Sequence, residues 1–485
     1  MTYTINLNIK SILDNTENFT DAKSNIIIKK YNYNNTDYNI IKYNKKNLNE
    51  LKNDEAEFNN LKNLRSVIVR DNKIVCFSPP KSVDYNKFVN KYADTSEIWA
   101  EDFVDGTMIN VFYDHANKVW EIATKSTVGG NIVFFNDVKN YKYFDDNNYF
   151  SDHYDLTFRS MFFETCNSNN FNLNTLNTNY CYSFIMQHPF NRIVTPIVTA
   201  TIYLVKVYDI NSEDLTNVTV KEINISSFVN CPPHIFLNTN VKFINKYPFS
   251  SYQDIKAMYN SDNTPYYCMG CVINSDDGIR SKIRNNNYEM VRQLRGNQPK
   301  LQYNYLNLRK NNKINEFLSY YPEHSLIFNK FRLALYSYTN ELFANYISCF
   351  IRKEKPLKEY VFAYKTHMYY LHELYKSELR PNKQNVDKKV VINYINSLEP
   401  AQLMFVINNA NSGANDDETN HETLRTTTGN MTDLSGMHSP KRLRRGGASG
   451  EQPASVDIGN DCTNVSGVQN DDNHEDDDAN DEMNE

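Results

Sequence analysis

Apolar and polar residues alternate between positions 101 and 135, and their pattern there predicts a β-hairpin. An apolar run from Met108 to Phe112 leads into the polar segment 114–117. A second apolar run, from Val119 to Ala123, follows directly. Two apolar runs separated by a short polar turn are typical of antiparallel strands. We expect the rest of the fold to be organised around this hairpin.

The same reasoning predicts a second hairpin and two further strands. The hairpin runs from Val67 to Phe77 with its turn at Asp71-Asn72, and Pro79-Pro80 ends its second strand. Apolar runs at residues 182–186 and 201–207 predict the further strands. Antiparallel sheets are therefore expected in this part of the chain.

The period of the apolar residues becomes helical in the later part of the chain. From Ile327 to Tyr346 they recur at steps of three and four, and Ser325 is the expected helix N-cap. Further helices are expected from Pro356 to Leu379 and from Val386 to Leu398. A short amphipathic helix is expected earlier, at residues 156–164. The fold class is α+β, with the later helices forming a domain of their own.

Composition indicates that most of the chain folds into packed domains. Its 485 residues are 40% apolar, which is enough for two or three domains. The last residues are rich in Asn, Asp, Gly, Ser and Thr, as is typical of a disordered acidic tail. The expected order is an N-terminal extension (1–60), an α+β domain (61–300), an all-helical domain (301–408) and this tail (409–485).

Charge and cysteine usage narrow the partners and the compartment. The net charge is −6, but acidic residues concentrate in the tail. The body that remains is mildly basic, which is compatible with an RNA partner or with solubility alone. The eight cysteines show no framework spacing, which favours a reducing, intracellular environment. We find no apolar leader and no stretch suited to crossing a membrane.

A basic cluster interrupts the acidic tail. Lys441, Arg442, Arg444 and Arg445 could form a nuclear localisation signal or contact nucleic acid. Alternatively, they pair with the acidic residues at 471–485. We therefore expect a cytoplasmic or nuclear location, with the tail as the contact for any protein partner.

The pair Cys268-x-x-Cys271 is half of a zinc-binding pattern. A structural zinc site needs four ligands, and no second pair stands at a usable spacing. We therefore expect core cysteines and predict no metal site.

Two segments beside the central hairpin carry candidate phosphate-binding groups. Asp105-Gly106 precedes its first strand, where the chain must turn sharply, and glycine permits such a backbone. Thr124-Lys125-Ser126, followed by Gly129-Gly130, offers one cation and two hydroxyls to a polyphosphate. An ordinary hairpin with a solvated lysine explains the same residues.

The segment beginning at Asp105 resembles the K-x-D-G motif of RNA and DNA ligases and capping enzymes. Residues 123–128 (ATKSTV) are similar to the S-K-G-S stretch that follows it in the phage RNA ligase 1 type. Upstream, Arg65-Ser66 and Asn86-Lys87-Phe88 stand where that family has an Arg-Gly strand and a K-F-F-N segment. The nucleotide-accepting lysine of the motif falls at Phe103.

Two later segments continue the resemblance in the same order. Residues 189–194 match P-x-N-R-I-V and include Arg192, but Ile185 replaces the glutamate that precedes this pattern. Residues 269–273 align with E-G-x-V-I, with Met269 in place of the glutamate. Lys282 and Arg284 align with the two lysines of the final motif, on one face of an expected strand.

The resemblance extends to ligase-related proteins of large nucleocytoplasmic DNA viruses and implies that 61–300 is a nucleotidyltransferase domain. Such enzymes attack ATP with a lysine amine, assisted by metal ions and cations. The nucleophile and both acidic positions are replaced here by apolar residues. The residues implied to bind phosphate or sugar remain: Arg65, Asp105, Gly106, Lys125, Arg192, Lys282 and Arg284.

We therefore expect a catalytically degenerate, ligase-like protein that binds RNA or a nucleotide. One alternative is an active ATP-dependent RNA ligase, with ATP and Mg²⁺ as cofactors, in which Lys125 or Lys81 carries the nucleotide. Another is a structural or virion-packaged interaction protein that keeps the fold as a scaffold. By the resemblance, the expected cytoplasmic location is a viral factory.

Overall fold

The computed structural model describes most of the chain up to Asn411. The described residues are 2–5, 9–14, 24–50, 55–92, 98–133, 157–211, 215, 218–229 and 234–411. The expected tail beyond residue 411, with its basic cluster, lies outside them. They form two compact units whose boundary falls between Ser337 and Tyr338. Residues 396–404 belong to the first unit, and residues 405–411 to the second.

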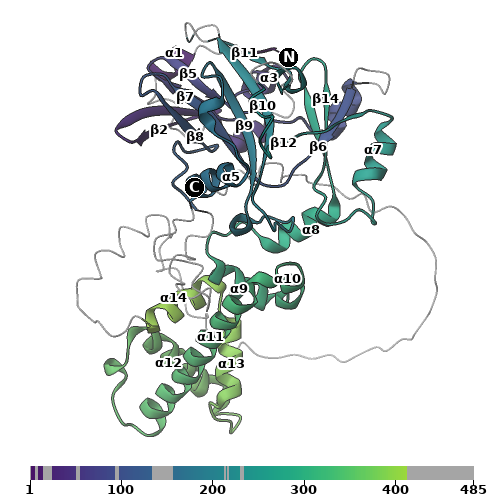
Figure 1. Cartoon of the computed structure of the whole chain (residues 1–485). Helices are drawn as coiled ribbons and strands as arrows, with labels where there is room; N and C mark the ends of the chain where they lie inside the picture. The colour runs from purple at the N-terminus through teal and green to yellow at the C-terminus, as the bar shows by residue number, and fades with distance from the viewer. Residues whose placement is uncertain are drawn as a thin grey trace, which may run out of the picture. The chain divides into compact units, whose positions relative to one another are not determined.

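Sheet A is the largest sheet of the first unit (Figure 1). Its strands pair in the order β1-β11-β10-β9-β7-β8, all antiparallel, and β12 adds to β10 in parallel. In that order the bounds are Thr2–Ile5, Val218–Glu222, Thr201–Asn211, Tyr180–Gln187, Thr107–Asp114 and Val119–Ala123, with β12 at Lys242–Phe243. The central hairpin expected from the sequence is β7–β8, and the structure confirms it.

Sheet B packs against one face of sheet A. It comprises β2 (Ile26–Tyr33), β3 (Thr36–Tyr43), β4 (Val67–Arg70) and β5 (Lys73–Phe77). The predicted hairpin at 67–77 is β4–β5, and its turn residues Asp71 and Asn72 adopt φ values of 47° and 57°. Asparagine and aspartate tolerate this left-handed backbone, which is why the turn forms there. Strands before residue 61 thus share sheets with strands after it.

Sheet C is smaller and stands beside sheet A. Its strands, in order, are β13 (Lys246–Pro248), β6 (Ile98–Asp102), β14 (Gly270–Ser275) and β15 (Arg280–Arg284). The chain passes from β6 in sheet C directly into β7 in sheet A. Residues 103–106 therefore connect the two sheets.

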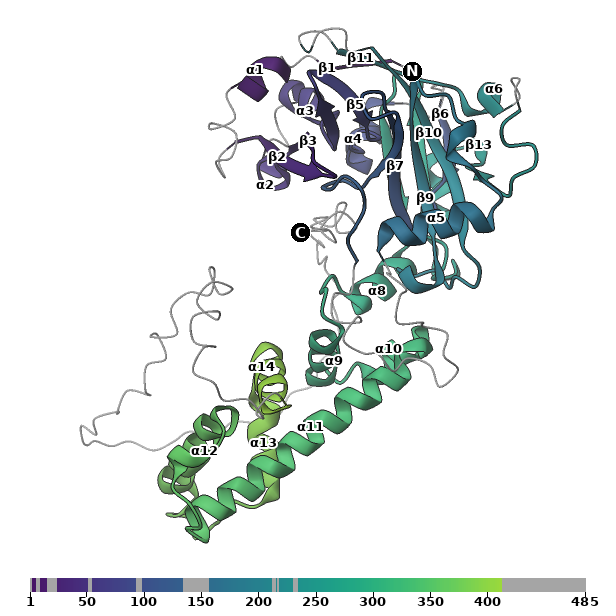
Figure 2. The same cartoon turned by 60° about the vertical axis from the view of Figure 1, so that its left-hand side comes forward.

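Helices cover the outer faces of the sheets. Helix α5 lies against sheet A on the face opposite sheet B (Figure 2). The sequence predicts this helix at residues 156–164, and in the structure it extends from Phe158 to Ser168. The other helices up to residue 295 are α1 (Ile9–Asp14), α2 (Lys45–Glu50), α3 (Glu55–Leu61), α4 (Tyr85–Lys91), α6 (Ile225–Val229), α7 (Tyr252–Tyr259) and α8 (Asn286–Arg295).

The later part of the chain is helical, as its period predicts. Helix α11 follows the expected period, but Ser325 is its first helical residue and not its N-cap, because the 3₁₀ turn Pro322–His324 leads straight into it. The next α-helix begins at Phe362 and not near Pro356. A single 3₁₀ turn at Leu357–Glu359 separates the two positions. The α-helices are α9 (Leu301–Lys310), α10 (Ile314–Tyr320), α11 (Ser325–Tyr346), α12 (Phe362–Leu374), α13 (Lys388–Ser397) and α14 (Pro400–Asn411). No helix of the described residues is long and apolar enough to cross a membrane.

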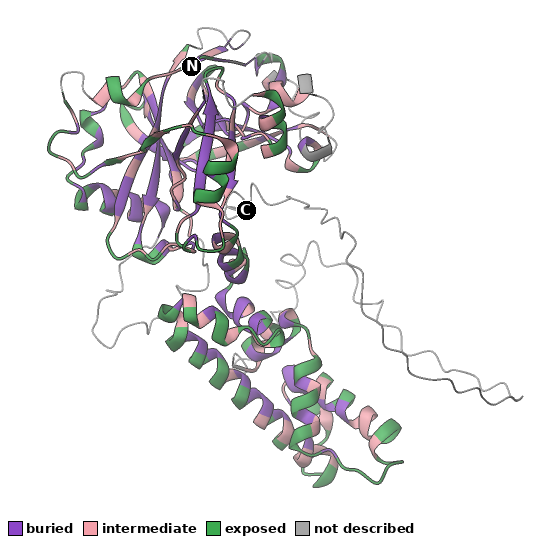
Figure 3. Ribbon diagram, turned by 90° about the vertical axis from the view of Figure 1, so that its right-hand side faces the viewer, coloured by how far each residue is buried: buried purple, intermediate pink, exposed green. Residues whose placement is uncertain are grey.

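Among the described residues, apolar clusters pack on the faces of the three sheets. One lies between sheets A and B, one lies between sheet A and α5, and one lies on the side of sheet C that α4 and α7 cover. Most residues of the long strands of sheet A are buried (Figure 3).

Candidate functional site

A cavity of about 550 Å³ lies where sheets A and C meet. Its walls are the 102–105 connection, Gln187 on β9, Tyr203 on β10, residues around Lys242 and the loop before β14. A volume of this size suits a small molecule. The cavity includes Phe103 and Met269, two of the positions singled out by the sequence.

Gly106 lets the connection pass close to sheet A. Its φ is +142°, and a Cβ there would stand 2.6 Å from the carbonyl oxygen of Met186. Only glycine fits both the backbone conformation and the space. The need for glycine after Asp105 is therefore explained by the local backbone and by the closeness of β9, without any ligand.

Asp105 is buried beneath the cavity and holds its neighbours in place. Its Oδ2 accepts hydrogen bonds from the backbone N–H groups of Val194 (3.0 Å) and Thr195 (2.8 Å). Its Oδ1 accepts one from the Tyr288 hydroxyl at 2.9 Å. Asp105 is only 3% exposed, and three protein donors satisfy its carboxylate. It joins the β6–β7 connection to the segment after β9 and to α8.

Arg192 is likewise engaged within the protein. Its Nε and Nη2 donate to the carbonyl oxygen of Val194 at 3.0 and 2.9 Å, and its Nη1 donates to Glu323 at 2.8 Å. The guanidinium also stacks on Tyr321, with its Cζ 4.6 Å from the ring centroid. The structure thus brings Asp105 and Arg192 to one segment, where both bind protein groups.

Phe103 stands beneath two cations of β15. The Lys282 Nζ is 5.1 Å and the Arg284 Cζ is 5.3 Å from its ring centroid. Alternate residues of a strand point to the same face, and Lys282 and Arg284 are two apart. A cation over an aromatic face is stabilised by about 0.5–2 kcal/mol. Arg284 also donates to Glu289 at 2.7 Å.

The two positions that lack the expected glutamates are buried and uncharged. Ile185 is 8% exposed and Met269 is 4% exposed. Ile185 packs where a Cβ on Gly106 would stand, at 2.7 Å from that position. Apolar side chains fill these places, and neither supplies a ligand for a metal ion.

Of the residues predicted to bind phosphate or sugar, Asp105 lines this cavity, and Lys282 and Arg284 stand beside it over the Phe103 ring. The other predicted cations lie at separate places. Lys125 stands over the Tyr43 ring at 5.4 Å. Lys81 follows the strand β5, and its backbone N–H donates to the carbonyl oxygen of Lys62. Arg65 lies beside Arg280, and burial together with this neighbour lowers the pKa of the Arg280 guanidinium.

A buried ion pair between sheets A and C was not predicted. Lys206 donates to Glu222 at 2.8 Å and lies 3.7 Å from Glu101. Although burial opposes it, Lys206 keeps the pKa of the Glu222 carboxyl below its usual value. Tyr3 donates to the other oxygen of Glu222 at 2.8 Å. These four residues come from four strands, β1, β6, β10 and β11, so no local spacing could have indicated the cluster.

Cavity residues from later segments were also missed. Lys242 stands over the ring of Tyr203 at 5.5 Å, and Asn245 donates to Asp102 through its side-chain amide at 2.8 Å. Both follow Asp102 by more than a hundred positions in the chain, and pattern reasoning does not connect segments so far apart.

The cysteines and the buried histidine near the site have structural surroundings. Cys271 lies in the core of sheet C, and Cys268 is half-buried at the cavity. Burial lowers the pKa of the His188 imidazole, although Glu164 at 3.4 Å from its Nε2 opposes this shift. Within the described ranges, no group of three or more acidic, histidine or cysteine residues could hold a metal ion.

Comparison with known proteins gives one sequence relative. No protein-family profile matches the chain. A segment of 114 residues, 23% of the chain, is 32% identical to an RNA ligase of Rhodothermus phage RM378 and covers 23% of that protein. The chain therefore spans less than a quarter of the length of this relative.

Two solved structures show a distant likeness. A protein of Aquifex aeolicus assigned as an ATP-dependent DNA ligase aligns at a TM-score of 0.34 and 11% identity, over 76% of this chain and 80% of its own. A lysine-to-alanine variant of the Naegleria gruberi RNA ligase, with ATP and Mn, aligns at 0.31 and 11% identity, over 54% and 76%. Neither score establishes a shared fold.

Proposed function

We propose that this chain binds a nucleotide or RNA non-covalently, on an RNA-ligase-like scaffold that has lost the lysine–AMP chemistry. The arrangement at Phe103 carries the proposal. The position that resembles the nucleophile of the ligases holds a ring, and Lys282 and Arg284 stand over it at 5.1 and 5.3 Å. Two cations beside a small-molecule cavity favour an anionic ligand.

The loss of catalysis follows from the side chains at the replaced positions. A phenylalanine has no amine to attack a phosphate, and losing a nucleophile costs several orders of magnitude in rate. Ile185 and Met269 are buried apolar residues, so no carboxylate stands at either place. Binding needs neither group, because cations and hydrogen-bond donors are sufficient for a phosphate.

A first experiment tests the absence of covalent chemistry. The full chain is incubated with α-labelled ATP or GTP and Mg²⁺ or Mn²⁺, and then separated by denaturing electrophoresis. We expect no labelled protein. A labelled band would overturn the proposal of degeneracy. Mapping it to Lys125 or Lys81 would establish the active-ligase alternative.

A second experiment measures binding at low and moderate salt with ATP and with a single-stranded RNA. The Lys282→Ala change should weaken binding by about tenfold, because a charge-assisted contact contributes about 1.5–3 kcal/mol. The matched control is Lys256→Ala, which also removes a cation over an aromatic ring, that of Tyr85 at 5.8 Å. Lys256 is exposed on α7, and the Tyr85 ring beneath it does not line the cavity, whereas the Phe103 ring beneath Lys282 does. Absence of any binding at low salt would refute the proposed function.

A further inference from the structure

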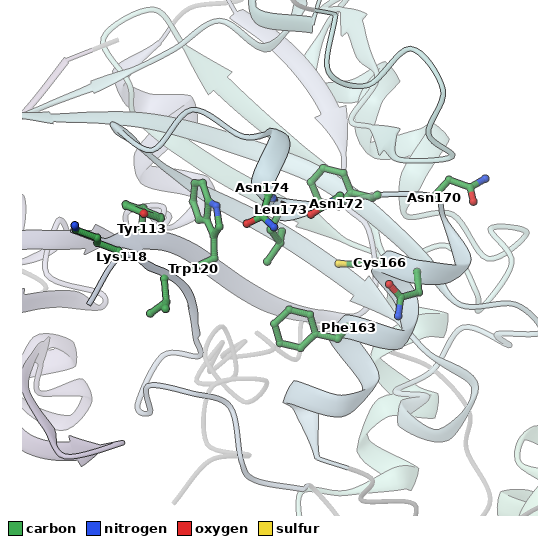
Figure 4. Close-up of a pocket in the computed structure, with 12 residues that line it drawn as sticks. Tyr113, Lys118, Trp120, Phe163, Cys166, Asn170, Asn172, Leu173 and Asn174 are labelled. Atoms are coloured by element: carbon green, nitrogen blue, oxygen red, sulfur yellow. Dashed lines mark hydrogen bonds between the residues drawn. The ribbon is translucent and has the colours of Figure 1, made fainter. Parts of the chain in front are cut away.

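A second cavity, of about 640 Å³, lies on the α5 side of sheet A (Figure 4). Strands β7 and β8 contribute Tyr113 and Trp120, and α5 contributes Phe163 and Cys166. The segment after α5, residues 170–174, closes another side. This cavity shares no residue with the one beside Phe103.

Packing holds the aromatic walls of the second cavity in place. Trp120 meets Tyr113 edge to face, with ring centroids 5.3 Å apart. Phe171 stacks on Phe236 at 5.7 Å, and the Arg159 guanidinium lies 5.0 Å from the Phe163 ring. Figure 4 shows Trp120 and Phe163 on different sides of the opening. Rings fixed in advance bind a planar ligand with little loss of entropy.

Asparagines provide the polar groups of this cavity. The side chain of Asn172 accepts from the backbone N–H of Asn174 at 3.0 Å and so caps the short 3₁₀ turn Leu173–Thr175. Asn167, Asn170 and Asn174 are exposed, and their side-chain amides make no hydrogen bond to the described part of the chain, so they are open to a ligand from solvent. Each amide carries both donors and an acceptor.

The lining of the cavity is uncharged except at its rim. Lys118, exposed at the β7–β8 turn, is the one ionisable cation or carboxylate among the lining residues. Burial raises the pKa of the Cys166 thiol to about 12, so the thiol is neutral at physiological pH. An open cavity whose lining is neutral apart from one cation suits a neutral ring that carries a phosphate.

We propose that the second cavity binds an unpaired nucleobase, with its phosphate toward Lys118. Bases stack on aromatic side chains, and their edges match the donor and acceptor pair of an asparagine amide. The base could belong to a free nucleotide or to a single strand of RNA, and the chemistry is the same. The inference does not rest on the function proposed for the first cavity.

Because Trp120 lines the second cavity, its fluorescence can report whether a ligand binds there. The chain contains two tryptophans, so the Trp99→Phe change leaves Trp120 as the only one. Its fluorescence is titrated with adenosine, with AMP, with a ten-nucleotide single-stranded RNA and with the same RNA in a duplex. We expect saturable quenching by AMP and by the single strand, and none by the duplex, whose bases are not free to enter. Tighter binding of the single strand than of AMP would identify RNA as the source.

Three substitutions in this background test the residues. Phe163→Leu should weaken binding of AMP and RNA by about tenfold, because a base stacked on an aromatic residue contributes on that scale. Asn167→Ala should weaken both by severalfold, because a neutral hydrogen bond contributes about 1 kcal/mol. Lys118→Ala should weaken AMP but not adenosine, since only AMP carries the phosphate. The control Asn131→Ala removes an exposed asparagine that does not line the cavity and should change nothing.

The outcomes separate the two cavities. Quenching that persists in Lys282→Ala supports a distinct second site, whatever becomes of binding beside Phe103. Quenching that disappears with Lys282→Ala, does not saturate, or is unchanged in both Phe163→Leu and Asn167→Ala would overturn the proposal. Far-ultraviolet circular dichroism of each variant verifies that it is folded.

Discussion

Replacing Asp105 with alanine distinguishes a structural carboxylate from a ligand-binding one. Three donors face this side chain: two backbone N–H groups and the Tyr288 hydroxyl. A hydrogen bond to a charged group contributes about 1.5–3 kcal/mol, and a buried donor left without a partner costs a similar amount. Because such contributions do not add fully, we expect Asp105→Ala to lower the free energy of unfolding by about 4 kcal/mol.

Urea denaturation measures this loss. Trp99 and Trp120, the two tryptophans, both lie in the first compact unit with Asp105, so their fluorescence follows the unfolding of that unit. With an m-value of about 3 kcal/mol/M, the midpoint should fall by more than about 1 M. Asp105→Asn keeps the shape and one acceptor oxygen, so its midpoint should fall by less.

An unchanged urea midpoint for Asp105→Ala would refute this reasoning. If Asp105→Ala unfolds at the same urea concentration as the unchanged protein, the carboxylate does not stabilise the connection between the sheets. If the midpoint is unchanged and ATP affinity falls, Asp105 contacts the ligand directly. An Asp105→Asn variant as unstable as Asp105→Ala would show that the charge, more than the geometry, carries the effect.

Further predictions concern space, protonation and thiol reactivity. Gly270→Ala should unfold sheet C at ambient temperature, because the added Cβ would stand 2.0 Å from the backbone oxygen of Ile283 and φ there is +125°. Gly296→Ala, whose Cβ would have 3.8 Å of clearance, should lower the free energy of unfolding by only about 1 kcal/mol. Circular dichroism and urea midpoints compare the two variants, and equal losses of stability would contradict the packing argument. Burial, against the opposing Glu323 carboxylate, lowers the pKa of His324 from 6.5 to about 4. The unfolded chain therefore binds the proton first, and the stability that His324 confers above pH 6.5 is lost as the pH falls toward 4. Relative to His324→Asn, the unchanged protein should lose about 2 kcal/mol over that range, and parallel pH profiles would refute this. Cys166, whose buried thiol has a raised pKa, should resist alkylation by iodoacetamide at pH 8 in the native state, whereas the half-buried Cys268 should react. Mass spectrometry of the peptides measures both alkylation rates, and equal rates would contradict the burial of Cys166.

Local chemistry explains the elements that could be predicted. The β4–β5 turn requires a left-handed backbone at Asp71 and Asn72, and both residue types adopt it readily. The existence of α11 follows from its apolar period of three and four, although Ser325 is its first helical residue and not the N-cap that the sequence predicted. The start of α12 could not be predicted as well, because Pro356 begins only a 3₁₀ turn and the chain is extended again at Val361.

The candidate sites depend on contacts that no local pattern encodes. Phe103 and the cations of β15 are far apart in the chain and meet only because β6 and β15 both pair with β14. The second cavity likewise needs a hairpin that ends at Ala123 and a helix that begins only at Phe158. Pairing of distant strands depends on the whole set of competing contacts, so residue spacing does not indicate these neighbours.

The sequence by itself determined which groups are available: no amine at Phe103, no carboxylate at Ile185 or Met269, and cations at Lys282 and Arg284. Folding cannot change those covalent facts. Only the tertiary structure decided how each group is used, and it directed Asp105 to three protein donors and Lys282 to an aromatic ring. The reason is physical, since burial and hydrogen-bond saturation are properties of the surroundings of a residue, and distant segments of the chain supply those surroundings.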